Sequence, residues 1–149
     1  MIERFTRELA LLEGYFKSLS SQPLQVTQCE VSYINHIEPA QGEPLRAKDW
    51  LGFMSFEEET EPADFAATFR RPVIDDDGKP YGRLIVEAAV GYKVDKSRIF
   101  ALTLTVRGAP KEASIPSALE FINKGRELIV MRFTQMTTDR AHTAWGRTK

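Results

Sequence analysis

Hydrophobic residues near the N-terminus recur every three or four positions, which is the period of an amphipathic helix. This pattern predicts a helix over residues 2–19, which cannot continue through Pro23. The following stretch, 24–37, is rich in β-prone residues whose apolar positions alternate. Because successive side chains of a strand point to opposite faces, we expect Tyr33 and Ile37 to share one face of a strand.

Residues 38–64 show no clean period and include Pro39, Pro44 and Pro62. A structureless loop of this length is uncommon in a compact domain, so we expect a short helix over 48–54, where apolar residues gather. An acidic run, Glu57–Glu61, follows it. We interpret this run as a solvated connector, and the alternative is a docking site for a basic partner.

The middle of the chain alternates most clearly between apolar and polar residues. Three strands are predicted, over 65–74, 82–92 and 98–107. The first two are joined by Asp77-Gly78, which supplies the positive φ angles that a hairpin turn needs. The pattern therefore predicts an antiparallel meander with one apolar face.

A helix is predicted over 116–136, where Ser117 and Glu120 match a capping box. We expect its apolar stripe to pack on the meander, with Arg126 filling the one position of the stripe that lacks an apolar residue. The stripe consists of Leu119, Ile122, Ile129, Phe133 and Met136.

The tail after this helix carries its own helix signal. Thr138 is a good N-cap for a short helix that would hold Trp145 near its end. We expect this tail to fold back, so that the indole packs on the domain or on a second copy of it. Arg147 would then pair with an acidic group, for which Glu57–Glu61 is a candidate.

These elements predict a single α+β domain over 1–149. Its antiparallel sheet would hold the three-stranded meander and the N-terminal strand, packed against the long C-terminal helix and the N-terminal helix.

Three segments together resemble a known family. They are the strand holding Tyr33-Ile34-Asn35, the helix end at 133–138 and the tail at 142–147. They are similar to a sporadically distributed, functionally uncharacterised prokaryotic family with a Tyr-Ile-Asn strand motif and a terminal Phe-x-x-Met-Thr and Trp-Gly-Arg pattern. The resemblance implies an accessory or defence-type role and no particular activity. It would cover the second half of a usual member, so the chain is either a minimal member or the second half of a longer protein.

Charge and composition exclude several classes of protein. The chain of 149 residues has 20 basic and 21 acidic residues and a net charge of -1, which disfavours a dedicated nucleic-acid binder. It shows neither an apolar run long enough to span a bilayer nor a signal peptide. A single cysteine allows no internal disulfide, which is typical of the cytoplasm. With only two histidines beside that cysteine, we expect no metal site and no cofactor.

Few residues suggest catalysis. His36 stands beside Asn35 and near Glu38, so it could act as a general base in a small hydrolase-like enzyme, and the alternative is an ordinary polar residue at a strand end. Cys29 has apolar neighbours on its face and is interpreted as a buried filler. The three aspartates at 75–77 lack the spacing of a calcium loop and are interpreted as a hairpin turn.

Arg71 and Arg126 stand in apolar phases of their elements. A charge there must be paired, reach the rim of the core or face a cavity, because burying it alone costs several kcal/mol. We therefore predict a non-catalytic module that binds a protein partner, a second copy of itself or a small anionic ligand, with the hydrolase as the alternative. The residues expected to contact the ligand or partner are Tyr33, Asn35, Arg71, Arg126, Trp145 and Arg147.

Overall fold

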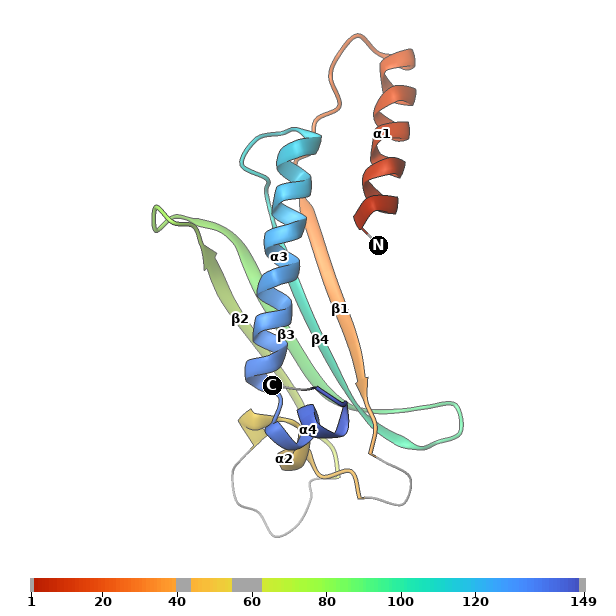
Figure 1. Ribbon diagram of the computed structural model, residues 1–149, viewed down its shortest axis with the longest axis vertical. Coiled ribbons are helices and arrows are strands. Elements are labelled where there is room, and N and C mark those ends of the chain that lie inside the picture. Colours follow the sequence, from red (N-terminus) through yellow and green to blue (C-terminus); the bar gives the residue numbers. More distant parts are fainter. Residues whose placement is uncertain (1, 40–43, 55–62, 148–149) are drawn as a thin grey trace.

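The protein is built around a four-stranded antiparallel sheet with the strand order β1-β4-β3-β2, seen in a computed structural model (Figure 1). The structure describes residues 2–39, 44–54 and 63–147. The strands are β1 (Cys29–Ile37), β2 (Ala66–Ile74), β3 (Pro80–Tyr92) and β4 (Arg98–Gly108). The helices are α1 (Ile2–Leu19), α2 (Ala47–Trp50), the 3-10 helix η1 (Gly52–Met54), α3 (Ile115–Met136) and α4 (Asp139–Ala144). The predicted α+β class is confirmed.

The predicted meander is present as β2, β3 and β4, which pair consecutively and antiparallel. Its first turn is held by the Asp75 carboxylate, which accepts hydrogen bonds from the backbone N–H groups of Asp77 (3.1 Å) and Lys79 (2.7 Å). Gly78 takes a φ of +78°, where a side chain would be strained. β1 pairs with β4, so β1 and β2 form the two edges of the sheet.

Helix α3 lies along one face of the sheet, above β1 and β4 (Figure 1). The apolar face predicted for the meander is buried: Leu84, Val86, Phe100 and Leu102 are each at most 5% exposed. The opposite face is more polar, and there Ser32 and Thr105 share a hydrogen bond of 2.7 Å.

The helix approaches the sheet most closely at Gly125, which is buried. A Cβ atom added at Gly125 would lie 2.8 Å from Val31 Cγ1 and 3.3 Å from Val106 Cβ. One turn earlier, Phe121 packs over Gly108, where an added Cβ would lie only 3.0 Å from the ring. Two glycines, one on α3 and one on β4, therefore set the distance between the helix and the sheet.

The predicted stripe of α3 is confirmed in part, since Ile129 is buried and Ile122, Phe133 and Met136 pack against the core. The start of α3 and the other residues of its buried face differ from the prediction. Its buried positions are Ala118, Phe121, Gly125 and Ile129. Arg126 is therefore not part of the buried stripe and is exposed, because the glycine beside it fills the place opposite the sheet. The N-cap is Ser114, whose hydroxyl accepts from the Ser117 backbone N–H, so the predicted capping box does not start the helix. A proline in the first turn is compatible with this earlier start, since its missing N–H would have no partner there.

Helix α1 has the predicted bounds but extends away from the sheet, joined to β1 by the segment 20–28 (Figure 1). Leu11, Tyr15 and Leu19 are each at least 63% exposed. We expected this helix to pack on the sheet, but its contact with the sheet is slight. The reason is that Pro23 lies in an extended segment, which places the helix beyond the end of β1.

The C-terminal tail folds back onto α2, as expected. Thr138 caps α4 by accepting from the Ala141 backbone N–H, and its own backbone N–H donates to the Trp50 carbonyl (3.1 Å). The Trp145 ring lies 5.8 Å from the Trp50 ring and 5.5 Å from the Phe133 ring, measured between centroids. Arg147 donates to Thr134 Oγ1 (2.9 Å). The acidic residues proposed to pair with Arg147 lie outside the described residues.

The close approach at Gly125 gives a first prediction. Changing Gly125 to alanine should lower the free energy of unfolding by about 1–2 kcal/mol, because overpacking outweighs the gain of about 1 kcal/mol in helix propensity. With Val31→Ala also present, the same change should become neutral or stabilising, since the clashing methyl is gone. Urea unfolding of the four proteins measures this coupling. Equal effects in both backgrounds would contradict the close contact.

The docked tail gives a second prediction. Trp145→Ala should lower the free energy of unfolding by about 1–3 kcal/mol, because the ring packs against two aromatic partners. A matched control is Tyr92→Ala, which removes a ring that is 65% exposed and should change stability by less than about 0.5 kcal/mol. If both variants unfold like the wild type, the tail does not stabilise the domain.

Candidate binding grooves beside helix α3

An open groove runs between the C-terminal half of α3 and the edge strand β1, with a volume of about 510 Å³. We call it the β1–α3 groove. It brings together three of the residues that the sequence predicted to bind, Tyr33, Arg126 and Arg147, although they are far apart in the chain. The groove is also lined by Glu127, Val130, Met131, Thr134 and Gln135.

The charge of this groove is positive. Arg126 and Arg147 supply two guanidinium groups, against the single carboxylate of Glu127. Among the described residues, no ion pair joins Glu127 to either arginine, and Arg147 is bonded to the Thr134 hydroxyl instead. The two guanidiniums therefore retain donors for an anionic partner.

The same groove offers apolar surface to a partner. Val130 and Met131 are 52% and 47% exposed. Tyr33 adds an aromatic ring from β1, with its residue paired to Leu104 in the sheet register. A partner that fills the groove would thus bury aliphatic and aromatic surface beside the two arginines.

The outer edge of β1 borders this groove. Within the part of the chain that the structure describes, β1 pairs with β4 alone. In an antiparallel pair, alternate residues direct their backbone N–H and C=O groups to the opposite side. The nine residues of β1 therefore present a row of backbone donors and acceptors that a further strand could bind.

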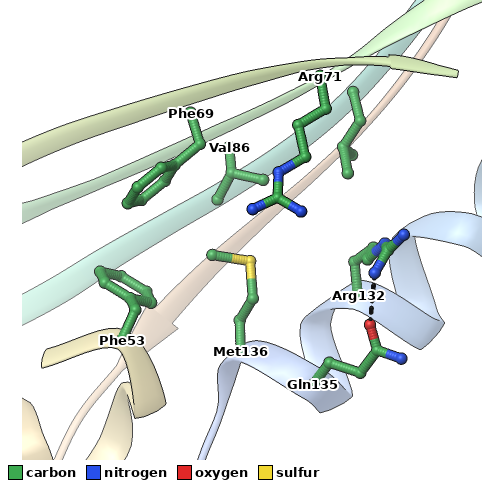
Figure 2. Close-up of a pocket in the computed structure, with 8 residues that line it drawn as sticks. Phe53, Phe69, Arg71, Val86, Arg132, Gln135 and Met136 are labelled. Carbon is green, nitrogen blue, oxygen red and sulfur yellow. Dashed lines mark hydrogen bonds between the residues drawn. The ribbon is translucent and has the colours of Figure 1, made fainter. Parts of the chain in front are cut away.

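A second and narrower space lies on the other side of α3, between the helix and β2, with a volume of about 250 Å³. We call it the β2–α3 cleft. Figure 2 shows the Arg71 guanidinium extending from the sheet toward Met136 and Arg132 on the helix. Arg71 pairs with the buried Leu84 in the sheet register, which confirms that it stands on the apolar face. The cleft is lined by Phe53, Phe69, Arg71, Leu84, Val86, Arg132, Gln135 and Met136.

Two predicted binding residues have structural partners instead. The Asn35 amide donates to the Leu102 carbonyl (3.1 Å), which ties β1 to β4. Trp145 packs in the folded-back tail between Trp50 and Phe133. Neither residue lines either of the two spaces beside α3.

Arg132 and Gln135 were missed by the sequence interpretation. Arg132 stands three residues after the buried Ile129, so it continues the buried face of α3 and is a charge in an apolar phase. The signal was present, because Ile129 and Met136, on either side of Arg132, belong to the predicted stripe. Gln135 borders both spaces and accepts a hydrogen bond from the Arg132 guanidinium (2.8 Å).

The residues of the hydrolase alternative do not all point to one face of the sheet. Asn35 and His36 are consecutive in β1, so their side chains point to opposite faces of the sheet. Glu38 accepts a hydrogen bond from the Lys93 ammonium (2.8 Å). His142 contacts the Thr137 hydroxyl (2.8 Å) near the docked tail.

Cys29 and the acidic residues offer little further chemistry. Cys29 is 7% exposed, and burial raises the pKa of its thiol, which keeps the thiol neutral at pH 7. In residues 2–39, 44–54 and 63–147, no three His, Cys, Asp or Glu side chains lie close enough to hold a metal ion.

The described helices include none with the length and apolar character needed to cross a membrane. Comparisons of the chain with protein-family models, curated proteins and solved structures gave no match. The resemblance to the Tyr-Ile-Asn family stays a prediction.

Proposed function

We propose that this protein is a non-catalytic binding module whose β1–α3 groove holds an extended acidic segment of a protein partner. The observation that carries the proposal is the meeting of Tyr33, Arg126 and Arg147 in one groove beside β1, which pairs on one side only within the described residues. The single cysteine favours the cytoplasm, and the family resemblance would make such a module an accessory or defence-type prokaryotic protein.

An extended segment fits this groove better than a compact ligand does. The groove is open, and its volume of about 510 Å³ follows α3 rather than closing around one point. A segment added to β1 would gain main-chain hydrogen bonds, and every second side chain would point toward α3. Those side chains would meet the two arginines and the exposed surface of Val130 and Met131.

Charge favours a different chain over a second copy of this one. Pairing two β1 edges would bring two sets of Arg126 and Arg147 to the same interface, and like charges brought together oppose association. An acidic segment removes this repulsion. Carboxylates also match the planar fork of arginine, which can bond both carboxylate oxygens.

A third prediction tests this groove with a short fluorescent peptide, Glu-Thr-Leu-Thr-Glu-Thr-Leu, whose alternate residues are acidic or apolar. The wild type should bind it, and Arg126→Gln with Arg147→Gln should weaken binding at least about tenfold, which corresponds to about 1.4 kcal/mol. A peptide with Lys in place of Glu should not bind. Fluorescence anisotropy at fixed salt measures all affinities.

Arg70→Gln is the matched control, because Arg70 is exposed on β2, away from the groove. This substitution removes one positive charge, as each of the two substitutions in the groove does. Its affinity should stay within about twofold of the wild type. Equal weakening by this control would show attraction to net charge alone and would overturn the groove. The mass of the free protein tests the second copy as the occupant. If the free protein is a dimer and a variant at the β1 edge, such as Ile34→Pro, is a monomer, a second copy occupies the groove.

The catalytic alternative is tested in the same series. His36→Gln should leave peptide affinity unchanged, because its side chain and the groove lie on different faces of the sheet. If peptide or ester hydrolysis is detected and falls about a hundredfold in this variant, the size expected for a lost general base, the protein is an enzyme.

A further inference from the structure

We infer that the β2–α3 cleft is a second binding site, for a small amphipathic carboxylate. This inference is independent of the β1–α3 groove, since it depends on Arg71 and Arg132 on the other side of the helix. The ligand would be a single carboxylate on a short aliphatic or aromatic body.

The head of the ligand is defined by two guanidiniums. Figure 2 shows Arg71 entering the cleft from β2, while Arg132 stands on α3 across from it. Among the described residues, no ion pair or hydrogen bond joins Arg71 to another side chain, and no acidic residue lines the cleft. Two positive groups facing one apolar space repel each other, and an anion between them removes that repulsion.

Arg132 adds a further observation. Its Nε atom is buried and has no hydrogen-bond partner within the described chain. A buried donor without a partner costs about 1–3 kcal/mol, so such groups are rare in folded proteins. One of its terminal nitrogens donates to Gln135, which holds the side chain at the cleft.

The body of the ligand is defined by the apolar walls. Phe53 and Phe69 meet edge to face, with centroids 5.4 Å apart, at the end of the cleft farther from the arginines (Figure 2). Val86 and Met136 form the sides between these rings and Arg71. The volume of about 250 Å³ lies just below the usual range of small-molecule sites, about 300–1,000 Å³, so the body must be short.

A fourth prediction tests this cleft with octanoate as the probe, by two-dimensional NMR titration of the full chain. Octanoate should shift the signals of the cleft, and Arg71→Gln should weaken its binding about tenfold. Arg70→Gln is the matched control, because it removes the same group from the adjacent residue, which points to the opposite face. The control should bind octanoate like the wild type.

Two control ligands test separately the contributions of the charged head and of the apolar body to binding. Octanol has the body without the charge, and acetate has the charge without the body, so each should bind at least about tenfold more weakly than octanoate. Equal binding of acetate would indicate simple anion attraction and would overturn the site. The Arg126→Gln, Arg147→Gln protein should keep its octanoate affinity, which makes a failure of this cleft distinguishable from a failure of the β1–α3 groove.

The chain carries a competing source of carboxylates in its sequence, at Glu57, Glu58, Glu59 and Glu61. Replacing these four residues with glutamine should leave octanoate affinity within about threefold of the wild type, as expected for loss of exposed charges. A rise of about tenfold or more would show that this acidic run competes for the cleft, and would overturn an external carboxylate as its natural occupant.

Discussion

The contact of Gly125 with Val31 and Val106 sets the distance between α3 and the sheet. Because the glycine has no side chain, the helix backbone can approach the side chains of β1 and β4 closely at this point. Phe121 and Ile129, on the neighbouring turns, are then buried to 4% and 0% exposure. The two spaces lie on either side of this close contact, one between α3 and β1 and the other between α3 and β2.

The flanks differ because the two edges differ. On the β1 side, α3 presents Val130, Met131 and Arg126 to an open groove beside the edge strand of the described sheet. On the β2 side, Phe53 from η1 and Phe69 close part of the space, which leaves a smaller cleft with arginines opposite each other. An open groove beside an edge strand suits an extended chain, and a narrow apolar cleft suits a small body with one charged head.

Much of the fold could be predicted from alternation alone. The three meander strands followed from their period of two and an Asp-Gly turn, and Arg71 was placed on the correct face by the same parity. The pairing of β1 with β4 could not be predicted, because it joins residues about seventy positions apart that no local pattern connects. The apolar stripe of α3 was predicted in large part, but Gly125 was missed, since a glycine contributes no hydrophobic signal although it is the residue nearest the sheet.

The candidate site was predictable only in part, for related reasons. Tyr33, Arg126 and Arg147 were identified singly, while their meeting depends on the tail folding back over Trp50. Arg132 was missed although its spacing from Ile129 and Met136 already put it in an apolar phase of the helix. The opposite directions of Asn35 and His36 follow from strand geometry, so their separation could have been foreseen.

Amide hydrogen exchange of β1 tests the central claim most directly, which is that an acidic segment adds to this edge beneath α3. In the free protein, alternate amides of β1 should exchange quickly, because their N–H groups face outward. With the Glu-Thr-Leu-Thr-Glu-Thr-Leu peptide bound, those alternate amides should become protected, while the amides of β2 keep their rates. Protection of β2 instead, or binding that leaves every β1 rate unchanged, would contradict the account.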